Sequence, residues 1–194
     1  NKLSTDELNI NNINIGVVGA GSWGTALADL LGKKGFKTDF WVFEKEVRDQ
    51  IEYERENKIF LPGFSLSENL FPSNDIAEVV SDKDIVLIVV PSHVMRETSV
   101  RIADHVSTDT IIVSASKGIE NKTRLTMTGV LAETLPHIPK NRFAVLSGPS
   151  FAKEVAKQFP TVVTVASKDK ETAGFVQRVF AMPFFRVYTN DDMI

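Results

Sequence analysis

Short apolar segments alternate along this chain with segments of helical periodicity. Each apolar segment is rich in branched or aromatic residues, and several lack the polar alternation of a half-exposed strand. Runs that are apolar throughout predict strands buried on both faces, as in a parallel sheet covered by helices. The predicted strands are 13–18, 38–43, 85–90, 110–114, 143–147, 161–166 and 184–189.

Apolar residues between these strands recur at helical spacing, and the predicted helices are 23–31, 46–55, 93–103, 124–135, 151–157 and 170–180. Regular alternation of strand and helix predicts an α/β fold with a doubly wound, mostly parallel sheet. We expect this domain to span 13–189. The polar segment 1–12, "NKLSTDELNINN", is expected to form an N-terminal extension.

Composition narrows the classes of protein that remain. The chain has 194 residues, of which 43% are hydrophobic and 24% charged, as in a globular domain with a substantial core. No apolar run approaches the roughly 18 residues that span a bilayer, and residues 1–12 lack the apolar core of a signal peptide, so we expect a cytoplasmic protein without stable membrane insertion. The net charge of −3, with Lys and Arg scattered, argues against nucleic acid as a partner. The chain has no cysteine and its three histidines lack ligand spacing, so no metal site is expected.

Three glycines, Gly19, Gly21 and Gly24, stand in a G-x-G-x-x-G spacing within "GVVGAGSWGTALA". The motif follows a predicted buried strand and opens a predicted helix, which is the context of a Rossmann-type dinucleotide fingerprint. Gly19 is expected in the tight turn, Gly21 where the backbone approaches a pyrophosphate, and Gly24 where the helix packs on the strand. Free N–H groups at the helix start favour a phosphate. The alternative is a purely structural turn.

An acidic residue completes this fingerprint. Glu44 lies 20 residues after Gly24, directly after "FWVF", where a carboxylate accepts hydrogen bonds from the adenosine ribose. Its charge favours NAD(H), whereas Lys45 and Arg48 nearby would offset its repulsion of the extra phosphate of NADP(H). The expected cofactor is therefore NAD(P)H. A solvated residue that opens the next helix is the alternative interpretation of Glu44.

The ends of later strands carry further candidates, since ligands of open α/β sheets lie beyond the carboxyl ends of the strands. These ends are "VVPSHV" with Pro91, "SASKGIE" with Lys117, and "LSGPSFAKEVA" with Gly148 and Ser150. Lys117 can present a cation to a substrate oxygen. Gly148 permits close approach of a ligand, and Ser150 is expected to cap the following helix. The alternative for Lys117 is an ordinary surface lysine in a loop.

The ordered segments "GAGSWGTALA", "PSHV", "SKGIE" and "LSGPSFAKEVA" resemble the bacterial NAD(P)-dependent glycerol-3-phosphate dehydrogenases. The segments "NKIFLPGFSLSENL" and "FRVYTNDDMI" are similar too. The resemblance implies reduction of dihydroxyacetone phosphate to glycerol 3-phosphate by hydride transfer, a step that supplies phospholipid synthesis. It implies that Ser22, Trp23, Phe43 and Ala152 contact the cofactor, that catalytic Lys117 touches cofactor and substrate, and that Gly148 and Ser150 contact the substrate.

Members of that family continue into a helical second domain, whose G-A-x-K-N-type segment supplies the proton-transfer lysine. By this resemblance, 190–194 begin that domain, and a chain that ends at Ile194 would be inactive alone; the whole enzyme would be compatible with a homodimer. Some phenylalanines are expected to face that domain in part: Phe151, Phe159, Phe180, Phe184 and Phe185.

Two other functions fit the glycine motif. One is a different Rossmann enzyme, such as a hydroxy-acid dehydrogenase or a ketopantoate reductase, which would not be expected to carry "SKGIE" and "SGPSFAKE" together. The other is a non-catalytic dinucleotide-binding sensor of redox state, whose cofactor binding would not depend on Lys117. The pairing of Lys117 with "SGPSF" favours the dehydrogenase.

Overall fold

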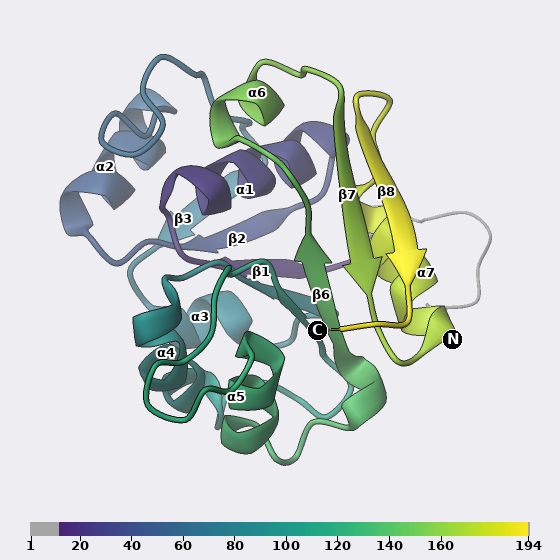
Figure 1. Cartoon of the computed structure of the whole chain (residues 1–194). Helices are drawn as coiled ribbons and strands as arrows, with labels where there is room; N and C mark the ends of the chain where they lie inside the picture. The colour runs from purple at the N-terminus through teal and green to yellow at the C-terminus, as the bar shows by residue number, and fades with distance from the viewer. Residues whose placement is uncertain (1–11, 194) are drawn as a thin grey trace.

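The computed structural model describes residues 12–193, which form one eight-stranded sheet in the order β3-β2-β1-β4-β5-β6-β7-β8 (Figure 1). Neighbouring strands are parallel except β6 and β7, which pair in opposite directions. The predicted doubly wound, mostly parallel fold is thereby confirmed. The strands are β1 (Ile15–Val18), β2 (Thr38–Trp41), β3 (Leu70–Ser73), β4 (Ile85–Ile88), β5 (Ile111–Ser114), β6 (Phe143–Ser147), β7 (Thr161–Ala166) and β8 (Phe185–Asn190).

Each predicted helix is present, in most cases with shifted ends. The helices are α1 (Ser22–Lys34), α2 (Lys45–Glu54), α3 (Ile76–Val80), α4 (Met95–Ile102), α5 (Met127–Thr134), α6 (Ala152–Ala156) and α7 (Lys170–Phe180), with the 3₁₀ turns η2 (Ser92–Val94) and η3 (Lys140–Arg142). The sequence patterns missed β3 and α3, which span only four and five residues. β3 reads LFPS, and its Pro72 argues against a strand in a sequence pattern, while α3 is a single short turn of helix between two loops. Asp75 starts α3, since its carboxylate accepts the N–H groups of Ala77 and Glu78.

The central strands β1, β4 and β5 are buried on both faces, as their continuous apolar runs predicted, whereas β7 and β8 each carry exposed residues. In β4, Ile85 and Leu87 belong to the core cluster under α1 and α7, whereas Val86 and Ile88 belong to the cluster under α3, α4 and α5. Successive side chains of a strand point to opposite faces, so a strand covered by helices on both sides is apolar at nearly every position, as β4 is.

The phenylalanines near the end of the chain divide into two groups. Phe151 and Phe159 are 70% and 52% exposed, and Phe184 is half-buried. Phe180 and Phe185 are fully buried, so the prediction that they face a further domain is wrong. They belong to the core cluster that includes β1 and α1, because α7 and β8 turn their apolar sides inward.

Of the predicted extension 1–12, only Asn12 lies within the described residues. At the other end β8 continues through Asn190, one residue beyond the predicted boundary. No helix within residues 12–193 is long and apolar enough to cross a membrane.

Candidate dinucleotide-binding site

The carboxyl ends of four strands meet along one edge of the sheet. The register places Val18 of β1 beside Ile88 of β4, Ile88 beside Ser114 of β5, and Ser114 beside Val145 of β6. The loops that carry Gly19, Pro91, Lys117 and Gly148 therefore leave the sheet along the same edge, as the sequence predicted. A hydrogen bond joins two of these loops, since the Val90 N–H donates to Ser116 Oγ at 3.0 Å.

The glycine motif forms a tight turn between β1 and α1. Gly19 has φ +114°, which disfavours a side chain, and its N–H donates to the Trp41 carbonyl at 3.2 Å. A Cβ at Gly24 would lie 2.0 Å from the Gly19 carbonyl oxygen, so the helix packs closely on the turn. A Cβ at Gly21 would meet nothing within 4 Å. Gly21 thus faces open space where a ligand can approach the backbone.

The N-terminus of α1 is built to receive an anion. Its N-cap residue, Gly21, provides no side chain to bond the first N–H groups of the helix, and the first turn carries no acidic residue. Those N–H groups have no intrahelical acceptor and carry the positive end of the helix dipole. Ser22 lies exposed at this end, whereas Trp23 is half-buried and packs against the core. A phosphate fits the N–H groups without displacing a protein carboxylate.

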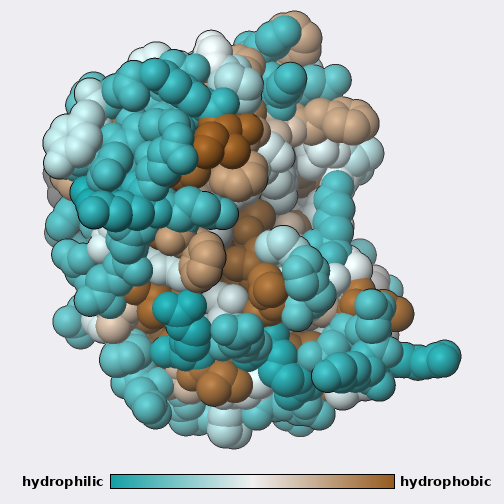
Figure 2. All heavy atoms as spheres, turned by 90° about the vertical axis from the view of Figure 1, so that its left-hand side faces the viewer, coloured by the Kyte–Doolittle hydropathy of each residue, from teal (hydrophilic) through white to brown (hydrophobic). Residues whose placement is uncertain are grey.

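A cleft of about 400 Å³ opens beside this turn. Gly19–Gly21 form one wall, and η2 and α4 form the opposite wall. Figure 2 shows apolar residues gathered around a hollow on this side of the molecule. Phe43 is 70% exposed and lines the cleft, so its ring is available to pack on a flat ligand. The predicted cofactor residues that line this cleft are Gly19, Gly21, Phe43, Glu44 and Pro91.

Glu44 lines the cleft as predicted, but the cation beside it is Arg101 and not Lys45 or Arg48. Glu44 is the N-cap of α2, but its carboxylate makes no capping hydrogen bond and lines the cleft. Arg48 is held outside it by Asn74 Oδ1 at 3.3 Å and by Asp49 Oδ1 at 2.9 Å. The cation on the wall is Arg101, 5.3 Å from the centre of the Trp41 ring.

Sequence reasoning missed Arg101, although a signal for it existed. The residues of the η2–α4 segment that line the cleft are Val94, Glu97, Thr98 and Arg101. This i, i+3, i+4, i+7 spacing places their side chains on one helical face. Because Pro91 directly precedes this segment, the same face of the helix could have been predicted to line the site.

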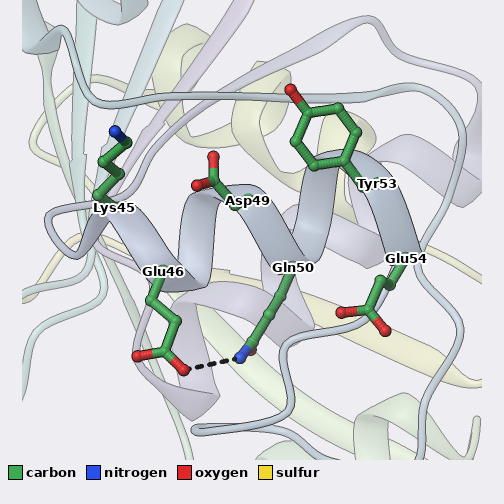
Figure 3. A pocket seen from close by; sticks show the side chains of 6 residues that line it. All are labelled: Lys45, Glu46, Asp49, Gln50, Tyr53 and Glu54. Carbon is green, nitrogen blue, oxygen red and sulfur yellow. Dashed lines mark hydrogen bonds between the residues drawn. The ribbon is translucent and has the colours of Figure 1, made fainter.

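A second hollow, of about 520 Å³, runs along the outer surface of α2 (Figure 3). All of its lining side chains come from this one helix, and Figure 3 shows them spreading to both sides without converging on a point. Lys45 is among them, so it lies away from the cleft wall. The hydrogen bond between Gln50 and Glu46, 3.4 Å, only links successive turns. This surface holds no convergent set of groups for a ligand.

Lys117 is exposed in the loop after β5, and among the described residues it has no hydrogen bond or ion pair. Gly118 beside it has φ +105°, and a Cβ there would lie 3.3 Å from Ser92 Oγ. Lys117 does not line the 400 Å³ cleft. It lies beyond the carboxyl end of β5, the strand beside β4, where its exposed side chain can meet a ligand that extends beyond the cleft.

The loop after β6 has a different geometry from the one predicted. A Cβ at Gly148 would lie 2.9 Å from the Val162 carbonyl oxygen, so this glycine admits the neighbouring strand β7. Ser150 does not cap α6, and that prediction is wrong: the N-cap is Phe151, and the Ser150 hydroxyl donates back to the Gly148 carbonyl at 3.3 Å. Ala152 is half-buried against the core. None of Gly148, Ser150 and Ala152 lines the cleft.

Asn57 is a site residue that sequence patterns did not single out. It is fully buried and hydrogen-bonds the carbonyl of Ala20, inside the glycine turn. It belongs to "NKIFLPGFSLSENL", a segment that contributed to the family resemblance without an assigned role. Within residues 12–193, no group of three or more His, Asp and Glu side chains is arranged to hold a metal ion.

Comparison with known proteins agrees with this geometry. Residues 14–173 match the family model described as the NAD-dependent glycerol-3-phosphate dehydrogenase N-terminus. The chain is 47% identical over 182 residues to a glycerol-3-phosphate dehydrogenase [NAD(P)+] of Syntrophotalea carbinolica, covering 94% of this chain and 55% of that protein. An enzyme of the same name from Geobacter metallireducens is 47% identical over 180 residues, covering 93% and 54%.

Solved structures give the same result. Glycerol-3-phosphate dehydrogenase from Coxiella burnetii superimposes with a TM-score of 0.87 at 36% identity, covering 93% of this chain and 55% of that one. The enzyme from Saccharomyces cerevisiae gives 0.82 at 26% identity, covering 93% and 57%. The chain thus spans about half the length of the relatives it matches. With a glycine turn, an open helix N-terminus and an adjoining cleft in the matched region, this chain belongs to the N-terminal domain family of the NAD-dependent glycerol-3-phosphate dehydrogenases.

Proposed function

We propose that this chain is the dinucleotide-binding half of an NAD(P)-dependent glycerol-3-phosphate dehydrogenase, which reduces dihydroxyacetone phosphate to glycerol 3-phosphate. One observation carries the proposal: the glycine turn and the open N-terminus of α1 face an apolar cleft, and the loop of Lys117 leaves the same edge of the sheet. The relatives' shared name supplies the substrate class.

The cleft residues divide by the chemistry they offer. The Gly21 backbone and the first N–H groups of α1 receive the diphosphate, with Ser22, Trp23 and Gly24 forming the first turn of that helix. Phe43 packs against the adenine, and Glu44 accepts hydrogen bonds from the ribose. Pro91 forms part of the opposite wall. Their common task is to hold the dinucleotide in one orientation, and the bound dinucleotide supplies the hydride.

Lys117, Gly148 and Ser150 do not line the cleft and are assigned to the substrate, with Lys117 also touching the cofactor. The Lys117 ammonium polarises the substrate carbonyl and stabilises the negative charge that develops on its oxygen. By the family resemblance, Gly148 and Ser150 contact the substrate and Ala152 contacts the cofactor. The absence of any ion pair on Lys117 within the described residues leaves its charge available for this role.

Calorimetric titration of this chain with NADH and with NADPH tests the proposal. We expect saturable 1:1 binding of at least one dinucleotide, and no comparable heat with ATP, because the glycine motif lacks a P-loop lysine. A chain that is folded by circular dichroism and binds neither dinucleotide would contradict the proposal.

Two further assays address the substrate and the setting. Activity of the whole enzyme on dihydroxyacetone phosphate, compared with ketopantoate, separates the proposed dehydrogenase from other Rossmann enzymes; activity on neither would favour a redox sensor. The cytoplasmic location and the homodimer expected from sequence stay predictions, to be tested by cell fractionation and by sedimentation of the whole enzyme.

A further inference from the structure

The side chain of Asn57 crosses from the segment after α2 into the glycine turn. Its Nδ2 donates to the Ala20 carbonyl at 3.0 Å and to Thr25 Oγ1 at 2.9 Å, and its Oδ1 accepts the Phe60 N–H at 3.0 Å. The residue is 0% exposed. Both donor hydrogens and the acceptor of this buried amide are therefore engaged by protein groups.

Thr25 adds a second hydrogen bond to the same carbonyl. Its hydroxyl donates to the Ala20 oxygen at 3.2 Å, and Thr25 is also fully buried. Two buried donors, Thr25 of α1 and Asn57, which lies 37 positions after Ala20, thus fix the direction of a single carbonyl. A carbonyl held by two donors cannot rotate away without leaving buried polar groups unpaired.

The direction of the Ala20 carbonyl determines that of the next N–H. The described residues contain no cis peptide bond, so the Gly21 N–H points opposite to the Ala20 C=O. Since the carbonyl points inward to Asn57 and Thr25, the N–H of Gly21 points outward. Gly21 lines the cleft, and its N–H has no protein acceptor among residues 12–193.

Asn57 also fixes the segment that follows it, up to Leu61, beside the cleft. Asn57 holds the N–H of Phe60, whose ring lines the cleft, and the Asn57 carbonyl accepts the N–H of buried Leu61 at 2.9 Å. The segment from Asn57 to Leu61 is thereby fixed against the glycine turn. A change at Asn57 is transmitted to the turn through one peptide unit, the one between Ala20 and Gly21.

We propose that Asn57, together with Thr25, is a positioning residue that aims the Gly21 N–H at the diphosphate of the bound dinucleotide. This inference rests on the proposed function. Asn57 touches no ligand in this scheme. It acts by keeping the Ala20–Gly21 peptide in the one orientation that presents a donor to the cleft, so the donor needs no rearrangement when the dinucleotide binds.

The test compares NADH affinity in this chain and in variants, by calorimetry. Asn57→Ala and Thr25→Val, which remove the donors to Ala20, are expected to weaken NADH binding about 10-fold or more, whereas Thr25→Ser keeps the hydroxyl and stays within about 2-fold of the parent. Asn69→Ala is the matched control. It removes a similar bond, from Asn69 Nδ2 to the Gly32 carbonyl at 2.9 Å, at the far end of α1.

A second readout separates positioning from general destabilisation. In ¹⁵N-labelled protein saturated with NADH, the Gly21 amide proton of the parent should move downfield as it gains a phosphate acceptor, and this shift should shrink in Asn57→Ala. Thermal midpoints show whether each variant is folded; if Asn57→Ala is not, Thr25→Val decides.

The outcomes are distinct. Weaker NADH binding in the donor-deleted variants, with Asn69→Ala like the parent, supports the inference. Parent-like affinity in folded Asn57→Ala or Thr25→Val, or equal losses in Asn69→Ala, overturns it while the proposed function stands. A folded parent that binds no dinucleotide overturns the proposed function and this inference together.

Discussion

Arg96 on α4 binds Glu120 through one edge of its guanidinium: Nε donates to Oε1 and Nη2 to Oε2, each at 2.8 Å. Nη2 also contacts Glu133 of α5 at 2.8 Å. Glu120 closes the loop that carries Lys117, since its N–H donates to the Leu125 carbonyl at 2.9 Å. The bidentate pair therefore fastens the loop of the proposed catalytic lysine to two helices.

The free energy of unfolding at acid pH should depend on the ion pair between Arg96 and Glu120. Hydrogen bonds from Arg96 and Thr123 lower the pKa of Glu120 from 4.5 to about 2. The unfolded chain takes up this proton near pH 4.5 and the folded chain only near pH 2, so the stabilisation is complete above pH 4.5 and is lost as the pH falls toward 2. In urea denaturation across this range, we expect the free energy of unfolding to fall less steeply in Glu120→Gln than in the parent.

Glu154→Gln provides the control for that experiment, since Glu154 is an exposed carboxylate on α6, away from Arg96. Its pH profile should follow that of the parent. Identical profiles for Glu120→Gln and the parent would show that the pair with Arg96 does not hold in solution.

Removing the Lys117 ammonium should affect turnover far more than cofactor binding. Lys117 lies outside the cleft wall, so Lys117→Ala in the whole enzyme is expected to leave the Kd for NADH within about 2-fold. Loss of a charge that stabilises the developing oxyanion should lower kcat by about 10³-fold. Steady-state kinetics with dihydroxyacetone phosphate and NADH titration measure the two effects, and unchanged kcat would remove Lys117 from the mechanism.

Two glycines of one motif should respond in opposite ways to alanine. Gly24→Ala places a methyl group 2.0 Å from the Gly19 carbonyl oxygen by the present geometry, so we expect a loss of about 2–3 kcal/mol in the free energy of unfolding. Gly21→Ala meets no protein atom within 4 Å and should change stability by less than about 1 kcal/mol. Its methyl group should instead weaken NADH binding, measured by calorimetry beside thermal denaturation. Equal stability losses would contradict this division of roles.

Glu44 should govern the choice between the two coenzymes. Its carboxylate lines the cleft without capping α2, and Arg48 is engaged elsewhere. In Glu44→Gln we expect NADPH affinity to rise relative to NADH by about 10-fold, because repulsion of the additional phosphate is lost. Arg48→Gln is the control and should leave the ratio of the two Kd values unchanged. A ratio unaffected by Glu44→Gln would contradict this role of Glu44.

Local sequence patterns predicted most of the helices and strands, and they singled out Gly19, Gly21 and Glu44, which line the cleft. Strands such as β4 are buried on both faces, which the continuous apolar run of 85–90 records directly. The glycine turn also depends on nearby residues. Positive φ at Gly19 and close packing at Gly24 both require glycine, so the turn can be recognised from the spacing of glycines in the sequence. Glu44 follows because β2 has a definite length and ends at the cleft.

Long-range contacts decided the remainder. The amide of Asn57 meets the Ala20 carbonyl across 37 residues, and Arg96 meets Glu120 across 24, distances over which no periodic pattern connects two side chains. The Ser150 hydroxyl donates to the Gly148 carbonyl, and Gly148 packs against antiparallel β7, a pairing direction that the apolar run 161–166 does not encode. Sequence alone determined which segments become buried strands and where the backbone must turn, since both depend on neighbouring residues. Which polar groups then face each other was settled only by packing, because that depends on how distant segments are brought together.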